Sequence, residues 1–162
     1  MRIVPSSSHT VSRQAGVGIE RLFDTVVAED VLPKVLRRWG PIPGVVGTRE
    51  LTGPWTTPGS ERTVVLEDGS TARERLVLWE RPHRFEYVVD RFTSPLGRFV
   101  DRATGAWQFA EHGTGSSFRW TYTFHARNLA ASIPLRLMVR SAWARYMAQC
   151  ADLTVKLALG PR

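Results

Sequence analysis

The chain has 162 residues, 43% of them hydrophobic and 23% charged, and 22 basic against 15 acidic side chains give it a net charge of +7. A chain of this length and composition can bury one sizeable core, so we expect a single domain over residues 1–162 rather than two. The only cysteine, Cys150, excludes an internal disulfide and fits a reducing compartment.

The N-terminal segment lacks the apolar run of a signal peptide, because only Ile3 and Val4 separate Arg2 from Pro5. No apolar stretch approaches the length of a membrane span, so we expect no stable membrane insertion. These features predict a soluble, cytoplasmic protein in which residues 1–8 form a flexible N-terminus.

The positive charge raises nucleic acid or an anionic membrane as a partner, since both attract clustered lysines and arginines. The arginines are instead scattered along the sequence, and no recognition motif accompanies them. We therefore expect a solvated, arginine-rich surface and no nucleic-acid partner.

Two short helices are predicted after a first strand. Residues 9–16, HTVSRQAG, alternate weakly and favour a strand, and the apolar residues that follow Ile19 recur at helical spacing. Asp30 is placed to cap the second helix, which should end at the breakers of WGPIPG. The apolar residues assigned to the two helices are Leu22, Phe23, Val26 and Val27, then Leu32, Val35, Leu36 and Trp39.

Residues 44–128 read mostly as strands that turn residues separate at nearly every join, which predicts an antiparallel meander. The strand segments are VVGTREL, ERTVVLE, TARERLVLW, RFEYVVDRF, GAWQFAE and SSFRWTYTFHA. From Ala131 to Leu159 the pattern is helical again, with Pro134 tolerated near the start. One face of this helix is expected to cover the sheet, and it comprises Leu135, Val139, Ala142, Trp143, Tyr146, Cys150, Leu153 and Leu157.

This order of elements resembles the START/Bet v 1-like (SRPBCC) superfamily, specifically its polyketide cyclase/dehydrase-like branch. The segments that carry the resemblance are IERLFDTVVAEDVLPKVLRRWGPIPG, PGSERTVVLEDGSTARERLVLWERPHRFEYVV and GAWQFAEHGTGSSFRWTYTF. The resemblance implies an α+β helix-grip fold, in which a curved antiparallel sheet of about six or seven strands wraps around the long C-terminal helix. It also implies an elongated apolar cavity between sheet and helix, and we expect the long connection TSPLGRFVDRAT to form its mobile rim.

Hairpin geometry predicts which side chains face inward. A turn at HGTG places Gly105, Trp107 and Phe109 opposite Tyr122, Trp120 and Phe118. A turn at ERPH places Leu76 opposite Tyr87 and Leu78 opposite Phe85, which turns Trp79 outward and Glu74 inward. The opposite register would bury two arginines in place of one glutamate, which costs more. Continuing around DGS, Arg62, Val64 and Leu66 also face inward.

This aromatic face has two interpretations: a solid core or the wall of a cavity. Buried indole and phenol groups need polar partners, and a solid core favours leucine, isoleucine and valine. Arg62 and Glu74 on the same face also suit a partly wet chamber. Because Gly105 has no side chain, we expect space beside Tyr122.

Other chemistry-bearing motifs are absent from the sequence. GVG at residues 16–18 and GTGSSF lack the context of a nucleotide loop, and the four histidines lack metal-ligand spacing. No serine elbow of the GxSxG type occurs, and Cys150 on an apolar helix face is expected to be inert. We therefore expect neither a metal nor another cofactor.

Three function classes follow, and the leading one is binding of a small hydrophobic molecule, lipid-like or polyketide-like, by a monomer or homodimer. The second is a polyketide aromatase/cyclase or dehydratase that acts on a poly-β-ketone in the same cavity, and the third a partner-binding module that uses the basic outer face. The candidate catalytic residues are Glu74 as acid or base, Arg62 as its charge partner or a carbonyl anchor, and Tyr87 or Tyr122 as hydroxyl donors, although Arg62 and Glu74 also suit a purely structural ion pair. The candidate ligand-binding residues are Arg62, Val64, Leu66, Glu74, Leu76, Leu78, Phe85, Tyr87, Val89, Trp107, Phe109, Trp120, Tyr122, Phe124, Val139, Trp143 and Tyr146.

Overall fold

The structure, a computed structural model, describes residues 5–160 of the chain. Within these residues the strands form one antiparallel seven-stranded sheet in the order β1-β7-β6-β5-β4-β3-β2. Apart from β1, each strand pairs with its neighbour in sequence, as the turn residues predict. The strands are β1 (Ser6–Ala15), β2 (Val45–Arg49), β3 (Glu61–Leu66), β4 (Thr71–Glu80), β5 (Arg84–Asp90), β6 (Val100–His112) and β7 (Gly115–Ala126).

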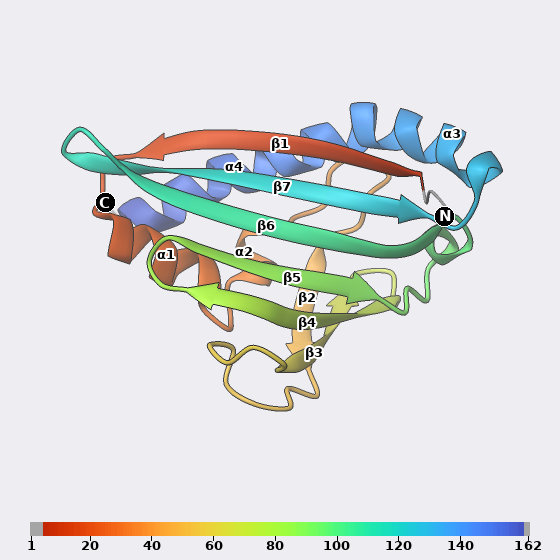
Figure 1. The fold of residues 1–162 in the computed structure, drawn as a ribbon, viewed down its shortest axis with the longest axis horizontal. Coiled ribbons are helices and arrows are strands. Elements are labelled where there is room, and N and C mark those ends of the chain that lie inside the picture. The colour runs from red at the N-terminus through yellow and green to blue at the C-terminus, as the bar shows by residue number, and fades with distance from the viewer. Residues whose placement is uncertain (1–4, 161–162) are drawn as a thin grey trace.

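The helices lie along one side of the sheet (Figure 1). The C-terminal helix runs beside β1 and β7 for much of the length of the molecule, while α1 and α2 lie near its C-terminal half (Figure 1). The helical elements are α1 (Ile19–Val27), α2 (Leu32–Val35), η1 (Pro95–Arg98), α3 (Leu129–Met138), η2 (Val139–Trp143) and α4 (Ala144–Leu159). This confirms the predicted helix-grip fold.

The predicted long C-terminal helix is continuous, and it contains one irregular turn. Asn128 caps its start, where the side chain accepts a hydrogen bond of 2.8 Å from the backbone N–H of Ala131. The segment η2 is a π-helix, which inserts extra backbone into one turn and rotates all that follows. Thr154 and Ala158 are therefore buried where a regular helix would bury Leu153 and Leu157, which are only half-buried.

The second helix is shorter than the sequence predicts. It ends at Val35, so Trp39 lies beyond it, in a turn where the backbone of Trp39 pairs with that of Ile42. Asp30 makes no capping bond to this helix, and its carboxylate pairs with Lys34 at 2.8 Å instead.

The predicted register of β4 fails at its C-terminal half. Leu76 faces Tyr87 as expected, but a bulge follows, so that Trp79 and not Leu78 lies opposite Phe85. Trp79 turns inward, and its ring meets that of Phe23 edge-on at 5.1 Å.

The N-terminal prediction also needs correction. Residues 1–4 lie outside the described part of the chain, whereas Ser6, Ser7 and Ser8 are the first residues of β1 and pair with β7. None of the helices in residues 5–160 is long and apolar enough to cross a membrane.

Candidate functional site

The inner face of the sheet has the predicted cross-strand pairs in β6 and β7. Gly105 lies opposite Tyr122, and the Trp107–Trp120 and Phe109–Phe118 pairs follow. The indoles of Trp107 and Trp120 stack with their ring centroids 4.9 Å apart. Gly105 also lies opposite Tyr87 on the other side, in β5.

One end of this face is solid. Phe23 of α1, fully buried, packs edge-on against Phe85 at 5.8 Å and against Phe109 at 5.0 Å. Phe118 lies beside Trp107 in the same cluster, with centroids 5.1 Å apart. Here the aromatic face is a close-packed core.

The other end encloses a cavity of about 350 Å³ between the sheet, α2 and the C-terminal helix. This volume lies within the range of small-molecule sites. The expected residues that line it are Arg62, Val64, Leu66, Glu74, Phe85, Tyr87, Val89, Trp107, Trp120, Tyr122, Phe124, Trp143 and Tyr146. The inner face of β7 thus serves both purposes, with Phe118 in the core and Trp120, Tyr122 and Phe124 on the wall.

Four expected residues lie elsewhere. Phe109 belongs to the solid end, and Leu76, which is fully buried, lies in the core rather than at the wall. Leu78 is displaced by the bulge in β4, and Val139 is buried without lining the cavity.

The sequence analysis missed several lining residues. Trp55 comes from the loop TGPWTTPG, where its only signal was a lone large aromatic between turn residues. Cys150 and Thr154 reach the cavity from α4. The others come from the helices, from loops at the rim and from strands β2 and β4: Val26, Val31, Leu32, Val35, Leu36, Pro41, Ile42, Pro43, Val45, Asp68, Ala72, Phe92 and Met138.

The wall of the cavity contains a buried ion pair. Arg62 and Glu74 lie opposite each other in β3 and β4, and Arg62 Nη2 donates to Glu74 Oε1 at 3.3 Å. The Arg62 and Glu74 side chains are only 4% and 8% exposed. Removing two charges from water is energetically costly, even when they pair with each other. The guanidinium carbon of Arg62 lies 3.9 Å from the centre of the Trp55 ring, so the cation also stacks on an aromatic face.

Burial affects both members of this pair. Arg62 Nε is buried without a hydrogen-bond partner. Burial raises the pKa of Glu74 above its ordinary value, and the positive charge of Arg62 opposes that shift without cancelling it. The wall therefore holds an unused donor and a carboxyl group that retains its proton more readily than usual.

Tyr87 fills the space that we expected beside Tyr122. Its ring lies over Gly105, where a Cβ atom would collide with it. The Tyr87 hydroxyl accepts a hydrogen bond of 3.1 Å from Trp120 Nε1, which leaves its own proton free to donate. Burial raises the pKa of Tyr87 and of Tyr122 far above the usual range, so both are donors and not bases.

The C-terminal helix supplies the facing wall. Trp143 packs between Tyr122 and Tyr146, with ring centroids 4.9 and 5.0 Å away, and its Nε1 is a second buried donor without a partner. Burial raises the pKa of the Cys150 thiol to about 12, so this cysteine is not an activated nucleophile.

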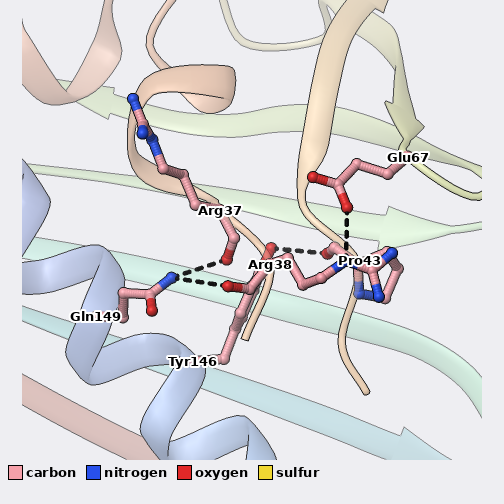
Figure 2. A network of polar contacts seen from close by, with 6 residues as sticks. All are labelled: Arg37, Arg38, Pro43, Glu67, Tyr146 and Gln149. Carbon is pink, nitrogen blue, oxygen red and sulfur yellow. Dashed lines mark hydrogen bonds and ion pairs between the residues drawn. The ribbon is translucent and has the colours of Figure 1, made fainter. Parts of the chain in front are cut away.

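Polar contacts from α4 hold the segment that closes one side of the cavity (Figure 2). Gln149 Nε2 donates to the carbonyls of Arg37 at 2.9 Å and Arg38 at 3.3 Å, and the Tyr146 hydroxyl donates to that of Pro43 at 3.4 Å. Arg38 in turn pairs with Glu67 at 2.9 Å (Figure 2). Pro41, Ile42 and Pro43, which line the cavity, are thereby fixed to the helix.

The connection between β5 and β6 reaches the opposite side. Phe92, Ser94, Pro95 and Leu96 line the cavity, as expected for a rim. The connection is shorter than predicted, because η1 occupies its middle and β6 already begins at Val100. Its mobility stays a prediction. Among residues 5–160 no three His, Cys, Asp or Glu side chains are grouped so that they could hold a metal ion.

The family model for polyketide cyclase / dehydrase and lipid transport matches residues 8–158. A search of curated protein sequences found no significant match. Among solved structures, Ara h 8.0201 is 15% identical, with a TM-score of 0.75 over 97% of this chain and 100% of that one.

Two further structures have the same fold. The di-domain ARO/CYC protein BexL from the BE-7585A biosynthetic pathway is 22% identical, with a TM-score of 0.68 over 97% of this chain and 51% of BexL. A Thalictrum norcoclaurine synthase mutant in complex with a transition-state analogue is 12% identical, with a TM-score of 0.68 over 98% of both chains. At these identities the likeness establishes the fold.

Proposed function

Because the chain belongs to the polyketide cyclase / dehydrase and lipid transport family, we propose that its cavity binds a small, largely hydrophobic molecule that carries a hydrogen-bond acceptor such as a ketone oxygen. The lining is mostly aromatic and aliphatic, which suits a flat, ring-bearing ligand. The ligand-binding residues are those of the expected set that line the cavity.

The observation that carries this proposal is the presence of two buried donors without partners, Arg62 Nε and Trp143 Nε1, on residues that line one cavity. A buried donor without an acceptor costs about 1–3 kcal/mol, so an acceptor on the ligand would recover stability at these positions. The two residues come from opposite walls, the sheet and the C-terminal helix.

A matched pair of probes tests this proposal: fluorenone and fluorene have similar shapes, and only fluorenone has a ketone oxygen. We expect fluorenone to bind more tightly by about threefold to tenfold, the value of one net hydrogen bond. Trp143→Phe removes the indole N–H while keeping a ring, and it should reduce that preference. Equal affinities for the two probes would refute the proposal that the cavity favours a ligand with a hydrogen-bond acceptor. If neither probe bound, the cavity would not be a site for flat apolar molecules.

A second candidate function is catalysis of aldol closure or dehydration on a poly-β-ketone. The observation that favours it is Glu74, a buried carboxyl with a raised pKa on the cavity wall, near the hydroxyl donor Tyr87. In a dehydration, the Glu74 carboxylate would take a proton from the carbon next to the ketone. The hydroxyl on the neighbouring carbon would then take that proton from Glu74 and leave as water, which returns Glu74 to its carboxylate form.

The aldol of benzaldehyde and acetone is a simple substrate for this reaction, because it loses water to give the absorbing product benzylideneacetone. If the protein is a dehydratase, it accelerates this reaction, and Glu74→Gln abolishes the acceleration while fluorenone still binds. If fluorenone binds and the aldol does not react faster than in buffer, the binding function stands alone.

A further inference from the structure

The exposed face of α3 carries a row of large aliphatic side chains. Leu129, Ile133 and Leu137 are 76%, 68% and 66% exposed, and they are three of the most exposed large hydrophobic residues in the described part of the chain. Their spacing of four residues places them on one side of the helix, opposite the buried Ala131 and Leu135. The row is about 12 Å long at the rise of an α-helix.

Arginines flank this row, and one carboxylate near its N-terminal end, Asp101, pairs with Arg102 and Arg127. Arg136 of α3 and Arg140, in the π-helical turn η2 that follows, are exposed beside the row. Arg98 of η1 is exposed in the neighbouring connection, where Arg127 Nε donates to the Gly97 carbonyl at 2.7 Å. No ion pair among residues 5–160 involves Arg98, Arg136 or Arg140. Between Glu111 and Asp152 the sequence has no acidic residue.

We propose that this face, defined by Leu129, Ile133, Leu137, Arg136 and Arg140, docks on the surface of an anionic lipid bilayer. Aliphatic side chains on one ridge of a helix, with arginines at the level of the headgroups, are the arrangement of interfacial helices. The docking is peripheral, and none of the helices in the described chain could span the membrane.

The shape of the face favours lipid over a protein partner. A stable protein interface covers about 800 Å² on each partner and usually offers pockets for side chains. Here three aliphatic side chains protrude from a helix whose opposite face, with Ala131 and Leu135, is covered by the protein. A ridge of this kind inserts between lipids, whereas a protein partner would need a matching groove and a wider contact.

The docking face is next to the cavity. Met138 lines the cavity, and it directly follows the exposed Leu137. Leu96 of η1 lines the cavity as well, and Phe99, which ends that turn, is 41% exposed. A docked molecule would therefore hold this side of the cavity close to the bilayer, from which a hydrophobic ligand can enter.

Sedimentation with vesicles tests the proposal, using phosphatidylcholine alone and phosphatidylcholine with about one phosphatidylserine in three lipids. We expect the protein to sediment with the anionic vesicles only, and salt to weaken that binding. Ile133→Glu with Leu137→Glu should abolish binding, and because both side chains are exposed the fold should persist by circular dichroism. Arg136→Gln with Arg140→Gln should weaken binding by about fivefold for each arginine.

The matched control is Arg75→Gln with Arg119→Gln, which removes the same charge from exposed positions on the sheet. It should leave vesicle binding nearly unchanged. An equal loss in this control, no binding to anionic vesicles, or binding that survives Ile133→Glu with Leu137→Glu would overturn the proposal. If the protein is a dimer that does not bind vesicles, and Ile133→Glu with Leu137→Glu dissociates that dimer, the face is instead an interface with a second copy of the chain. Because no cavity ligand is added in this experiment, a failure to bind vesicles does not bear on the proposed binding of a hydrophobic molecule in the cavity.

Discussion

Tyr122 and Phe118 lie on the same face of β7 and separate the wall of the cavity from the core. Both are buried, at 7% and 2% exposure, but only Tyr122 lines the cavity. A wall residue loses fewer contacts on truncation, so Tyr122→Ala should cost less than the roughly 3–5 kcal/mol expected for Phe118→Ala. Urea denaturation of both variants measures this difference, and Tyr122→Ala should also weaken fluorenone binding. Equal losses of stability with unchanged binding would show that Tyr122 is ordinary packing.

Gly105 is needed because the ring of Tyr87 lies on it. Gly105→Ala places a methyl group into that ring, and overpacking of this kind costs about 1–3 kcal/mol. In a Tyr87→Leu background the same substitution should cost much less, because the collision partner is gone. A double-mutant cycle by chemical denaturation gives the coupling, and additive effects would contradict the contact.

Glu74 gives the stability of the protein a pH dependence that can be isolated. Burial raises the pKa of Glu74 in the folded state above its ordinary value of 4.5, so the folded protein holds the proton more tightly than the unfolded chain. This contribution to stability is complete below that value, and it is lost as the pH rises through the folded-state pKa.

We therefore expect the difference in free energy of unfolding, wild type minus Glu74→Gln, to be flat in acid and to decrease with pH above the ordinary value, by at most about 1.4 kcal/mol per pH unit. Subtracting the variant removes the opposite contributions of exposed carboxylates such as Asp24, whose pKa Arg81 lowers through its hydrogen bonds. A difference that increases with pH would mean that the ion pair with Arg62 outweighs burial.

At the scale of elements, Gln149 links α4 to the segment that follows α2. Gln149→Ala removes two hydrogen bonds to backbone carbonyls and should cost about 1 kcal/mol. Hydrogen exchange of the amides in residues 37–43 should become faster, since the anchor of this segment is lost (Figure 2). Lys156→Ala, on an exposed position of the same helix, is the control and should change neither quantity. Unchanged exchange in Gln149→Ala would show that Tyr146 alone holds the segment.

The sequence predicts the strands best where turns are tight and alternation is strict. The pairing of Gly105 with Tyr122 follows from a two-residue turn and large side chains at every second position. In β4 the residues Leu76, Val77, Leu78 and Trp79 are all apolar, so alternation cannot distinguish a regular strand from one with a bulge. The inward Trp79 was missed for that reason.

The prediction of the inward face of the C-terminal helix is wrong after residue 150 for a related reason. An α-helical period places Leu153 and Leu157 inward, but the π-helical turn at Val139–Trp143 shifts the phase of the helix after it. Nothing in those five side chains distinguishes a π-helical turn from an α-helical one. Trp55 was missed because a loop residue has no periodicity that could place it against Arg62.

The whole molecule has a solid end and a hollow end, and they are built differently. The solid end joins α1 to the aromatic pairs of β5, β6 and β7. The hollow end is closed by short elements: α2 with four residues, η1 with four residues and the irregular turn of residues 36–44. Buried apolar contacts oppose local opening. Because the short elements of the hollow end have fewer such contacts than the solid end, they should open more easily.

Native-state hydrogen exchange measures this division across the whole chain. We expect the slowest amides in β6 and β7 near Trp107 and Phe118, with opening free energies equal to that of global unfolding. Amides of α2, η1 and residues 36–44 should open at lower free energy, because few buried contacts are lost when they move. Fluorenone, bound to the closed cavity, should raise the opening free energy of these segments by about 2.7 kcal/mol at a concentration a hundred times its dissociation constant. It should leave partial openings elsewhere unchanged, since those do not release the ligand. If every segment has the same opening free energy, the cavity is part of one cooperative unit, and the ligand does not enter through local opening of α2, η1 or residues 36–44.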